Sequence, residues 1–284
     1  MPRIIPFFFI LALFLSCSSK SAEGDKSSLE SSTTGVPDMV KLASLETPDG
    51  LLFSIYPWRY TNALRPGDSL ELVFQCYNKS SQPIDGAKVF RESLLVLHYP
   101  DQTVVQSDEE FLGIWQKAGT IEPGASYGPP VDIARLFAMK ELGEYSAEWE
   151  VGGYELVYPL MVMERTDYFL YRLKNDTCYN DWGLHMYGED GVYSSKCLAG
   201  EAIALGTAIV PGLQVFLGDT REAFIEGSED ATIASMYAWR VCDFAAIMLI
   251  EILKQEPGGI RSMDPAVRDK RIEELNQWLS ENEK

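Results

Sequence analysis

Few side chains in this 284-residue sequence have the types and spacing that catalysis or metal binding requires. There are five cysteines and two histidines, His98 and His185. The sequence contains no Cys-x-x-Cys pair and no His-Glu-x-x-His motif, which argues against a zinc or redox centre. It also lacks a Gly-x-Ser-x-Gly nucleophile motif and a phosphate-binding loop. These patterns predict a non-catalytic protein without a metal or cofactor.

The cysteine with the most informative surroundings is Cys17. Arg3 and then an apolar run over residues 4–15 precede it. That run is shorter than the roughly 20 residues of a membrane-spanning helix, and it has the length of the apolar core of a secretory signal. Small Ser16 stands at the cleavage position, so residues 1–16 are predicted to be a signal peptide. The alternative is an ordinary cleaved signal followed by a chance cysteine.

Residues 13–17, Leu-Phe-Leu-Ser-Cys, resemble the lipobox of bacterial lipoproteins, with Phe14 where that family usually has Leu. The resemblance implies that Cys17 carries acyl chains such as palmitate and anchors the mature protein to a membrane of the cell envelope. In a two-membrane cell, Ser18 in place of Asp implies the outer membrane rather than the inner one. The sequence leaves open whether the protein faces the periplasm or the cell exterior.

Residues 17–46 are predicted to be the lipidated cysteine followed by a flexible tether. Ser, Lys, Glu, Asp and Gly dominate residues 18–34, and such a composition buries too little apolar surface to fold. The whole chain has a net charge of −18, and removal of a signal with one positive charge makes it more negative. This acidity argues against binding to nucleic acid and against adsorption to anionic lipid headgroups. The lipid would therefore provide the membrane attachment.

Residues 47–165 are predicted to be a β-sandwich, because short alternating runs are separated by Pro- and Gly-containing turns. The clearest run is residues 69–78, which places Leu70, Leu72, Phe74 and Cys76 on one face. Other strands are expected at residues 51–56, 94–99, 144–151 and 155–163.

The segment Leu-Gly-Glu-Tyr-Ser-Ala at residues 142–147 resembles the tyrosine corner of immunoglobulin-like domains. In that family the tyrosine hydroxyl bonds back to the chain, and a disulfide cysteine follows two residues later. Here Ala147 occupies the second cysteine position, so the usual disulfide cannot form. Cys76 is therefore expected to be a buried small hydrophobic residue.

Residues 197–284 are predicted to be a small all-α domain. Apolar side chains recur at helical spacing over residues 197–217 and 230–254, and Pro211 is expected to divide the first of these into two short helices. Asp264 and Pro265 have the residue types of an N-cap and first position of a final helix.

The helical residues resemble HEAT repeats in two places. Residues 204–219 are similar to the end of a first repeat helix, and residues 240–249 to a second helix, in which Arg240 and Asp243 would stabilise the turn. The two parts are about twenty residues apart, which exceeds normal repeat spacing, and no second copy follows. A plain helical bundle is the alternative.

The connecting segment, residues 166–196, is rich in aromatic and polar side chains. Tyr and Trp combine a large contact area with a polar group, so this segment could be a recognition surface. The candidate residues are Tyr179, Trp182, His185 and Tyr187. The alternative is a connection whose aromatic side chains attach it to the core, and this alternative is favoured.

A disulfide between Cys178 and Cys197 is the best candidate pair in an oxidising compartment. It would close a loop of about 20 residues and stabilise the fold by roughly 3 kcal/mol on the chain-entropy model. Cys242 lies in an apolar helical run and is expected to be buried.

The sequence thus favours an envelope-anchored binding or scaffolding lipoprotein with an unidentified protein partner. Two alternatives remain. One is a hydrolase or small-ligand-binding protein with a pocket near His185, and the other is a structural envelope protein without a specific ligand.

Overall fold

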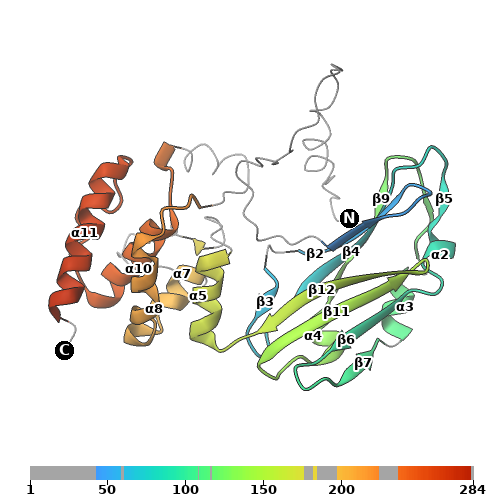
Figure 1. Cartoon of the computed structure of the whole chain (residues 1–284), viewed down its shortest axis with the longest axis horizontal. Coiled ribbons are helices and arrows are strands. Elements are labelled where there is room, and N and C mark those ends of the chain that lie inside the picture. Colours follow the sequence, from blue (N-terminus) through green and yellow to red (C-terminus); the bar gives the residue numbers. More distant parts are fainter. Residues whose placement is uncertain are drawn as a thin grey trace, which may run out of the picture. The chain divides into compact units, whose positions relative to one another are not determined.

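The chain folds into a β-rich region followed by a helical region, as the sequence predicts (Figure 1). The computed structural model describes residues 43–58, 61–107, 109–115, 117–175, 182–183, 197–223 and 236–282. All of these residues belong to one compact unit, Gly35–Lys284. We refer to residues 43–162 as the β region and to residues 165–282 as the helical region.

The first sheet has five strands and is antiparallel throughout. Its main path runs β1-β2-β4-β10, and β9 also pairs with β4. The strands are β1 (Ala43–Glu46), β2 (Leu51–Pro57), β4 (Glu71–Asn78), β9 (Ser126–Tyr127) and β10 (Pro130–Asp132).

The second sheet has the order β3-β12-β11-β6-β7, and only the β3–β12 pair is parallel. Its strands are β3 (Ala63–Leu64), β6 (Leu94–His98), β7 (Val104–Gln106), β11 (Gly143–Val151) and β12 (Tyr154–Val162). A short hairpin and three short helices complete the β region: β5 (Ile84–Asp85), β8 (Thr120–Ile121), α2 (Gly86–Val89), α3 (Glu109–Trp115) and α4 (Ile133–Phe137).

One hydrophobic core holds the two large sheets together, and Trp149 is fully buried within it. The Trp149 ring on β11 meets Phe53 on β2 and Phe74 on β4 edge-on, with centroids 5.7 and 5.4 Å apart. Its indole nitrogen donates to the Ser93 hydroxyl at 2.6 Å, so this buried polar group is satisfied. The alternating strands therefore direct their apolar faces into a shared interior.

Two local predictions for the β region are confirmed. The Tyr145 hydroxyl donates a 2.8 Å hydrogen bond to the Glu141 carbonyl, four residues upstream. Cys76 is fully buried on β4, and burial raises the pKa of its thiol to about 12. Leu70, Leu72 and Phe74 are buried as well.

The helices of the helical region pack around one central helix, α10 (Val241–Leu253). Residues 241–250 are buried on every side, which is typical of a helix enclosed by neighbours. The other elements are α5 (Arg165–Asn175), α7 (Leu198–Ile203), η1 (Gly206–Ala208), α8 (Val210–Val215), η2 (Phe216–Gly218) and α11 (Pro265–Asn282).

Proline and N-cap signals place two helix boundaries as predicted. Pro211 lies in the first turn of α8, so the apolar run is divided into α7 and α8. Asp264 precedes α11, and its carboxylate accepts a 2.9 Å hydrogen bond from the Ala266 N–H.

The predicted continuous helix over residues 230–254 is wrong, because residues 236–237 are helical but residues 238–240 are not. The helix α10 begins only at Val241, because Arg240 is extended (φ −121°, ψ 162°) and pairs with Glu222 in an isolated β-bridge. Ala238 also has a positive φ of 44°, which a continuous helix does not permit. Residues 230–235 lie outside the described part.

Arg65, directly after β3, connects the two regions. Its guanidinium forms ion pairs with Asp68 at 2.7 Å and with Glu201 of α7 at 2.5 Å. It also lies over the Tyr168 ring of α5, 5.1 Å from the centroid. Arg65 therefore joins the end of a strand to two helices that follow it by about 100 residues or more in the chain.

Candidate binding groove

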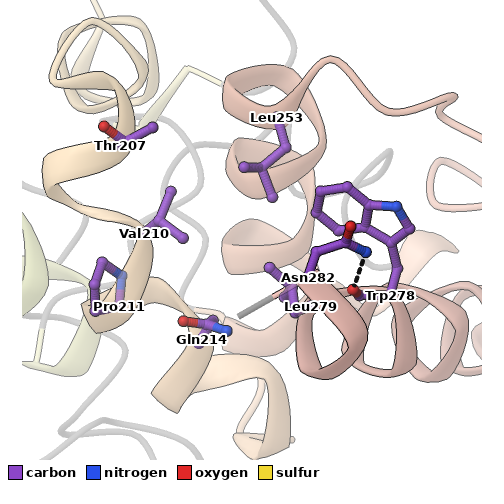
Figure 2. Close-up of a pocket in the computed structure, with 8 residues that line it drawn as sticks. All are labelled: Thr207, Val210, Pro211, Gln214, Leu253, Trp278, Leu279 and Asn282. Atoms are coloured by element: carbon purple, nitrogen blue, oxygen red, sulfur yellow. Dashed lines mark hydrogen bonds between the residues drawn. The ribbon is translucent and has the colours of Figure 1, made fainter. Parts of the chain in front are cut away.

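A groove in the helical region lies between α8 and the C-terminal ends of α10 and α11 (Figure 2). Its cavity volume is about 340 Å³, which is in the range of small-ligand sites. The lining residues are Thr207, Val210, Pro211, Gln214, Leu253, Trp278, Leu279 and Asn282. Figure 2 shows the four residues from η1 and α8 on one side of the opening, facing those from α10 and α11.

The groove offers apolar contact and amide groups. None of its eight lining side chains carries a charge at neutral pH, so they supply no general acid or base. The Asn282 amide nitrogen donates to the Trp278 carbonyl at 2.7 Å, which caps the last turn of α11. These walls therefore offer apolar contact and hydrogen-bonding groups to a bound segment.

The wall formed by α8 belongs to an uncharged part of the chain. Residues 202–218 contain no Asp, Glu, Lys or Arg, although charged residues make up 23% of the whole sequence. Several of these uncharged positions are exposed, and Val215 is 77% exposed. Val215 follows Gln214, which lines the groove, so an exposed apolar side chain stands next to this wall in the chain.

Close packing at Gly212 positions α8. A Cβ atom at this position would lie 2.3 Å from Leu170 Cδ1 of α5, so a glycine permits this approach of the two helices. Pro211 fixes the backbone at the start of the same helix.

A buried ion cluster fixes α11 relative to α10. Asp243 is fully buried and forms ion pairs with Arg240 at 2.9 Å and with Arg268 at 3.1 Å. Hydrogen bonding to Asp243 raises the pKa of Arg240. Arg268 also donates to the Ala238 carbonyl at 3.0 Å and lies over the Trp239 ring. These contacts hold the two helices whose C-terminal ends form the other wall of the groove.

The described part of the structure does not bring the candidate site residues from the sequence analysis together in one place. Cys17, Cys178, Tyr179, His185 and Tyr187 lie outside the described residues. The lipidation and the disulfide therefore remain predictions.

Two of the sequence-based candidates are described, and both are buried. Trp182 contacts Phe169 and Phe244, with ring centroids 6.5 and 6.3 Å apart, so it contributes to the core rather than to a surface. Cys197 is the N-cap of α7, where its Sγ accepts a hydrogen bond from the Gly200 N–H at 3.4 Å.

His98 has a clear partner on the second sheet. Its Nε2 lies 2.8 Å from the Glu148 carboxylate on the neighbouring strand. Within the described ranges, no group of three or more His, Cys, Asp or Glu side chains is arranged to hold a metal ion. No helix in that part of the chain is long and apolar enough to cross a membrane.

Comparisons with protein-family models and with curated proteins find no match to this sequence. The groove must therefore be interpreted from its own geometry. Sequence reasoning missed it because its walls come from positions about 40 to 75 residues apart. The one local signal was the uncharged run at residues 202–218, which is apolar without being fully buried.

Proposed function

We propose that this protein is an envelope-anchored lipoprotein that acts as a non-catalytic binding or scaffolding module. The observation that carries the proposal is the uncharged groove between α8, α10 and α11, which fits an uncharged apolar segment of a protein partner. Its lining side chains provide shape and hydrogen-bonding amides but no acid–base pair. The proposed anchor is the acylated Cys17, with the outer membrane as the site of attachment. The tether would be shorter than residues 17–46, because residues 43–46 form strand β1, which pairs with β2.

We also propose finer assignments for the two regions. The β region would be an immunoglobulin-like sandwich, which the hydrogen bond from Tyr145 to Glu141 supports. The helical region would be a degenerate HEAT-like domain. The ion pair of Arg240 with Asp243 at the start of α10 supports this, because the resemblance gives these two residues that role.

The anchor is tested by replacing Cys17. We expect Cys17→Ala to release the protein from membranes, because the acyl chains attach through that sulfur. Fractionation of cells that produce the variant, with the Ser18→Ala protein as control, measures the effect. Continued sedimentation of the Cys17→Ala protein with membranes would contradict the anchor.

The groove is tested by placing a charge at its wall. Thr207 lines the groove and is exposed, whereas its neighbour Ala208 is exposed without lining it. A photo-crosslinking residue at Val215 in the full-length protein should capture one protein of constant mass in cells. We expect Thr207→Arg to abolish that crosslink and Ala208→Arg to leave it intact.

Two outcomes would overturn the proposed binding role of the groove. One is a crosslinking pattern at Val215 that matches that of the same residue placed at Met263, an exposed position away from the groove. The other is equal crosslinking by the Thr207→Arg and Ala208→Arg proteins.

A further inference from the structure

The outer face of the second sheet is a separate exposed surface in the β region. Along β11 and β12, inward side chains are buried and the alternate side chains lie on the outer face. Strand register places β6, β11 and β12 side by side, so their outward residues form one surface. The exposed residues on this side are Glu144, Glu150, Glu155, Val157 and Pro159. The half-buried ones are Leu94, His98, Ser146, Glu148 and Met161, and Val96 is buried among them.

This outer face carries four carboxylates and no permanent positive charge. The carboxylates are Glu144, Glu148, Glu150 and Glu155, and no strand of the second sheet contains a Lys or Arg. Glu150 and Glu155 stand directly opposite each other on neighbouring strands. Like charges at such positions destabilise a sheet, so folding alone does not favour this arrangement.

Apolar side chains lie among these carboxylates. Val157 is 49% exposed and stands opposite Glu148, while Pro159 follows it on the same face and is exposed. Val104 on the edge strand β7 is 53% exposed and stands opposite His98. The face therefore combines exposed aliphatic groups with negative charge, which is a combination that a partner of opposite charge can match.

We propose that this face docks a protein partner whose contact surface presents Lys or Arg side chains together with aliphatic groups. A second copy of this chain does not fit, since it would place carboxylates against carboxylates. Nucleic acid is disfavoured for the same electrostatic reason. A metal ion is disfavoured because the described residues form no metal-ligating cluster.

The size of the face predicts a transient contact. The nine residues of β11 extend about 30 Å, and three neighbouring strands span roughly 14 Å. The resulting area of roughly 400 Å² is below the ~800 Å² that each partner contributes to a standard interface. Binding should therefore be weak and sensitive to salt. This inference does not depend on the lipid anchor or on the groove in the helical region.

A synthetic peptide serves as the probe. A fluorescent peptide of about ten alternating Lys and Val residues matches the length of the strands. Its binding to the full-length protein, purified from cells in nonionic detergent, is measured by fluorescence anisotropy. We expect saturable binding that weakens at least tenfold when NaCl rises from about 20 to about 200 mM, because the Debye length then falls from roughly 20 to roughly 7 Å.

Two double variants that remove the same amount of charge from different places show where the peptide binds. Glu150→Gln with Glu155→Gln should weaken binding about tenfold, because two exposed ion pairs are lost. The control is Glu122→Gln with Glu273→Gln, which removes the same charge from exposed positions away from this face. We expect less than a twofold change in the control and, for Val157→Ser, a loss of about threefold. The Thr207→Arg protein should bind the peptide as the unaltered protein does.

Four results would overturn the proposal. The first two are an absence of peptide binding at about 20 mM salt and equal losses of peptide affinity in the two Gln double variants. The other two are equally strong binding of a Glu–Val peptide and complete displacement of the peptide by spermine at the same concentration of positive charge. The last result would show a general polycation site. Carbodiimide crosslinks between the peptide and Glu150 or Glu155, mapped by mass spectrometry, would support the proposed location.

Discussion

The β region and the helical region bury different kinds of polar residue. In the β region, the described buried polar residues are neutral, such as Asn78 and Ser93. In the helical region they are charged, namely Arg172, Asp243 and Arg268. The sheets are held by backbone pairing and an aromatic core, whereas the helices depend in part on an ion cluster between distant segments. The two regions should therefore respond differently to loss of charge and loss of packing.

The largest expected effect comes from the buried ion cluster. Asp243→Asn leaves Arg268 without its buried counter-charge, and breaking such a pair costs about 3–5 kcal/mol. The free energy of unfolding, measured by urea denaturation, should fall by that amount. Asp269→Asn is the control, because Asp269 contacts the same Arg240 at 2.7 Å but is 57% exposed. The free energy of unfolding of this control should fall by under about 1 kcal/mol. Equal losses in the two variants would contradict the dependence of the helical region on its buried ion cluster.

The second largest loss of stability is expected from the contact between the two regions at Arg65. Arg65→Ala removes two ion pairs and the contacts with two aromatic rings and should cost about 1–2 kcal/mol. Hydrogen exchange of β3 and α5 amides should become faster, while that of β11 stays unchanged. Lys79→Ala is the control, since its ion pair with Glu46 is exposed and lies within the β region. Unchanged exchange in both β3 and α5 would show that Arg65 does not couple the regions.

A change in the packing of α8 should cost less stability than loss of the Asp243 cluster or of the Arg65 contact. Gly212→Ala places a Cβ atom against Leu170, and the strain should exceed the gain in helix propensity by about 1 kcal/mol. Thermal unfolding should show a lower Tm. Gly218→Ala is the matched control, because nothing lies within 4 Å of its Cβ position. If both variants have the same Tm, close packing at Gly212 does not position α8.

The smallest expected effect is a gain in stability. Glu155→Gln relieves the repulsion from Glu150 directly opposite and should stabilise the protein by about 0.2–0.5 kcal/mol at low salt. Glu144→Gln is the control, because Glu144 stands opposite Met161. The difference between the two variants should vanish at about 1 M salt, where screening is nearly complete. A difference that persists at that salt concentration would not be electrostatic.

The two regions also differ in how well the sequence predicts their helices and strands. Strands such as β4 were identified because alternation and turn residues are local signals, and the buried Leu72 and Phe74 confirm the predicted face. The start of α10 was misplaced because Arg240 belongs to a β-bridge with Glu222, which lies earlier in the chain. Apolar periodicity does not report such a contact.

The sequence by itself determined the order of a β region and a helical region, the boundary at Pro211 and the N-cap at Asp264. It also contains the features at Cys17 that predict the anchor. Only the tertiary structure decided that residues 207–214 and 278–282 form one groove and that Glu150 faces Glu155. The physical reason is that capping, proline geometry and strand alternation depend on neighbouring residues. Grooves and sheet faces depend on the packing and register of segments far apart in the chain.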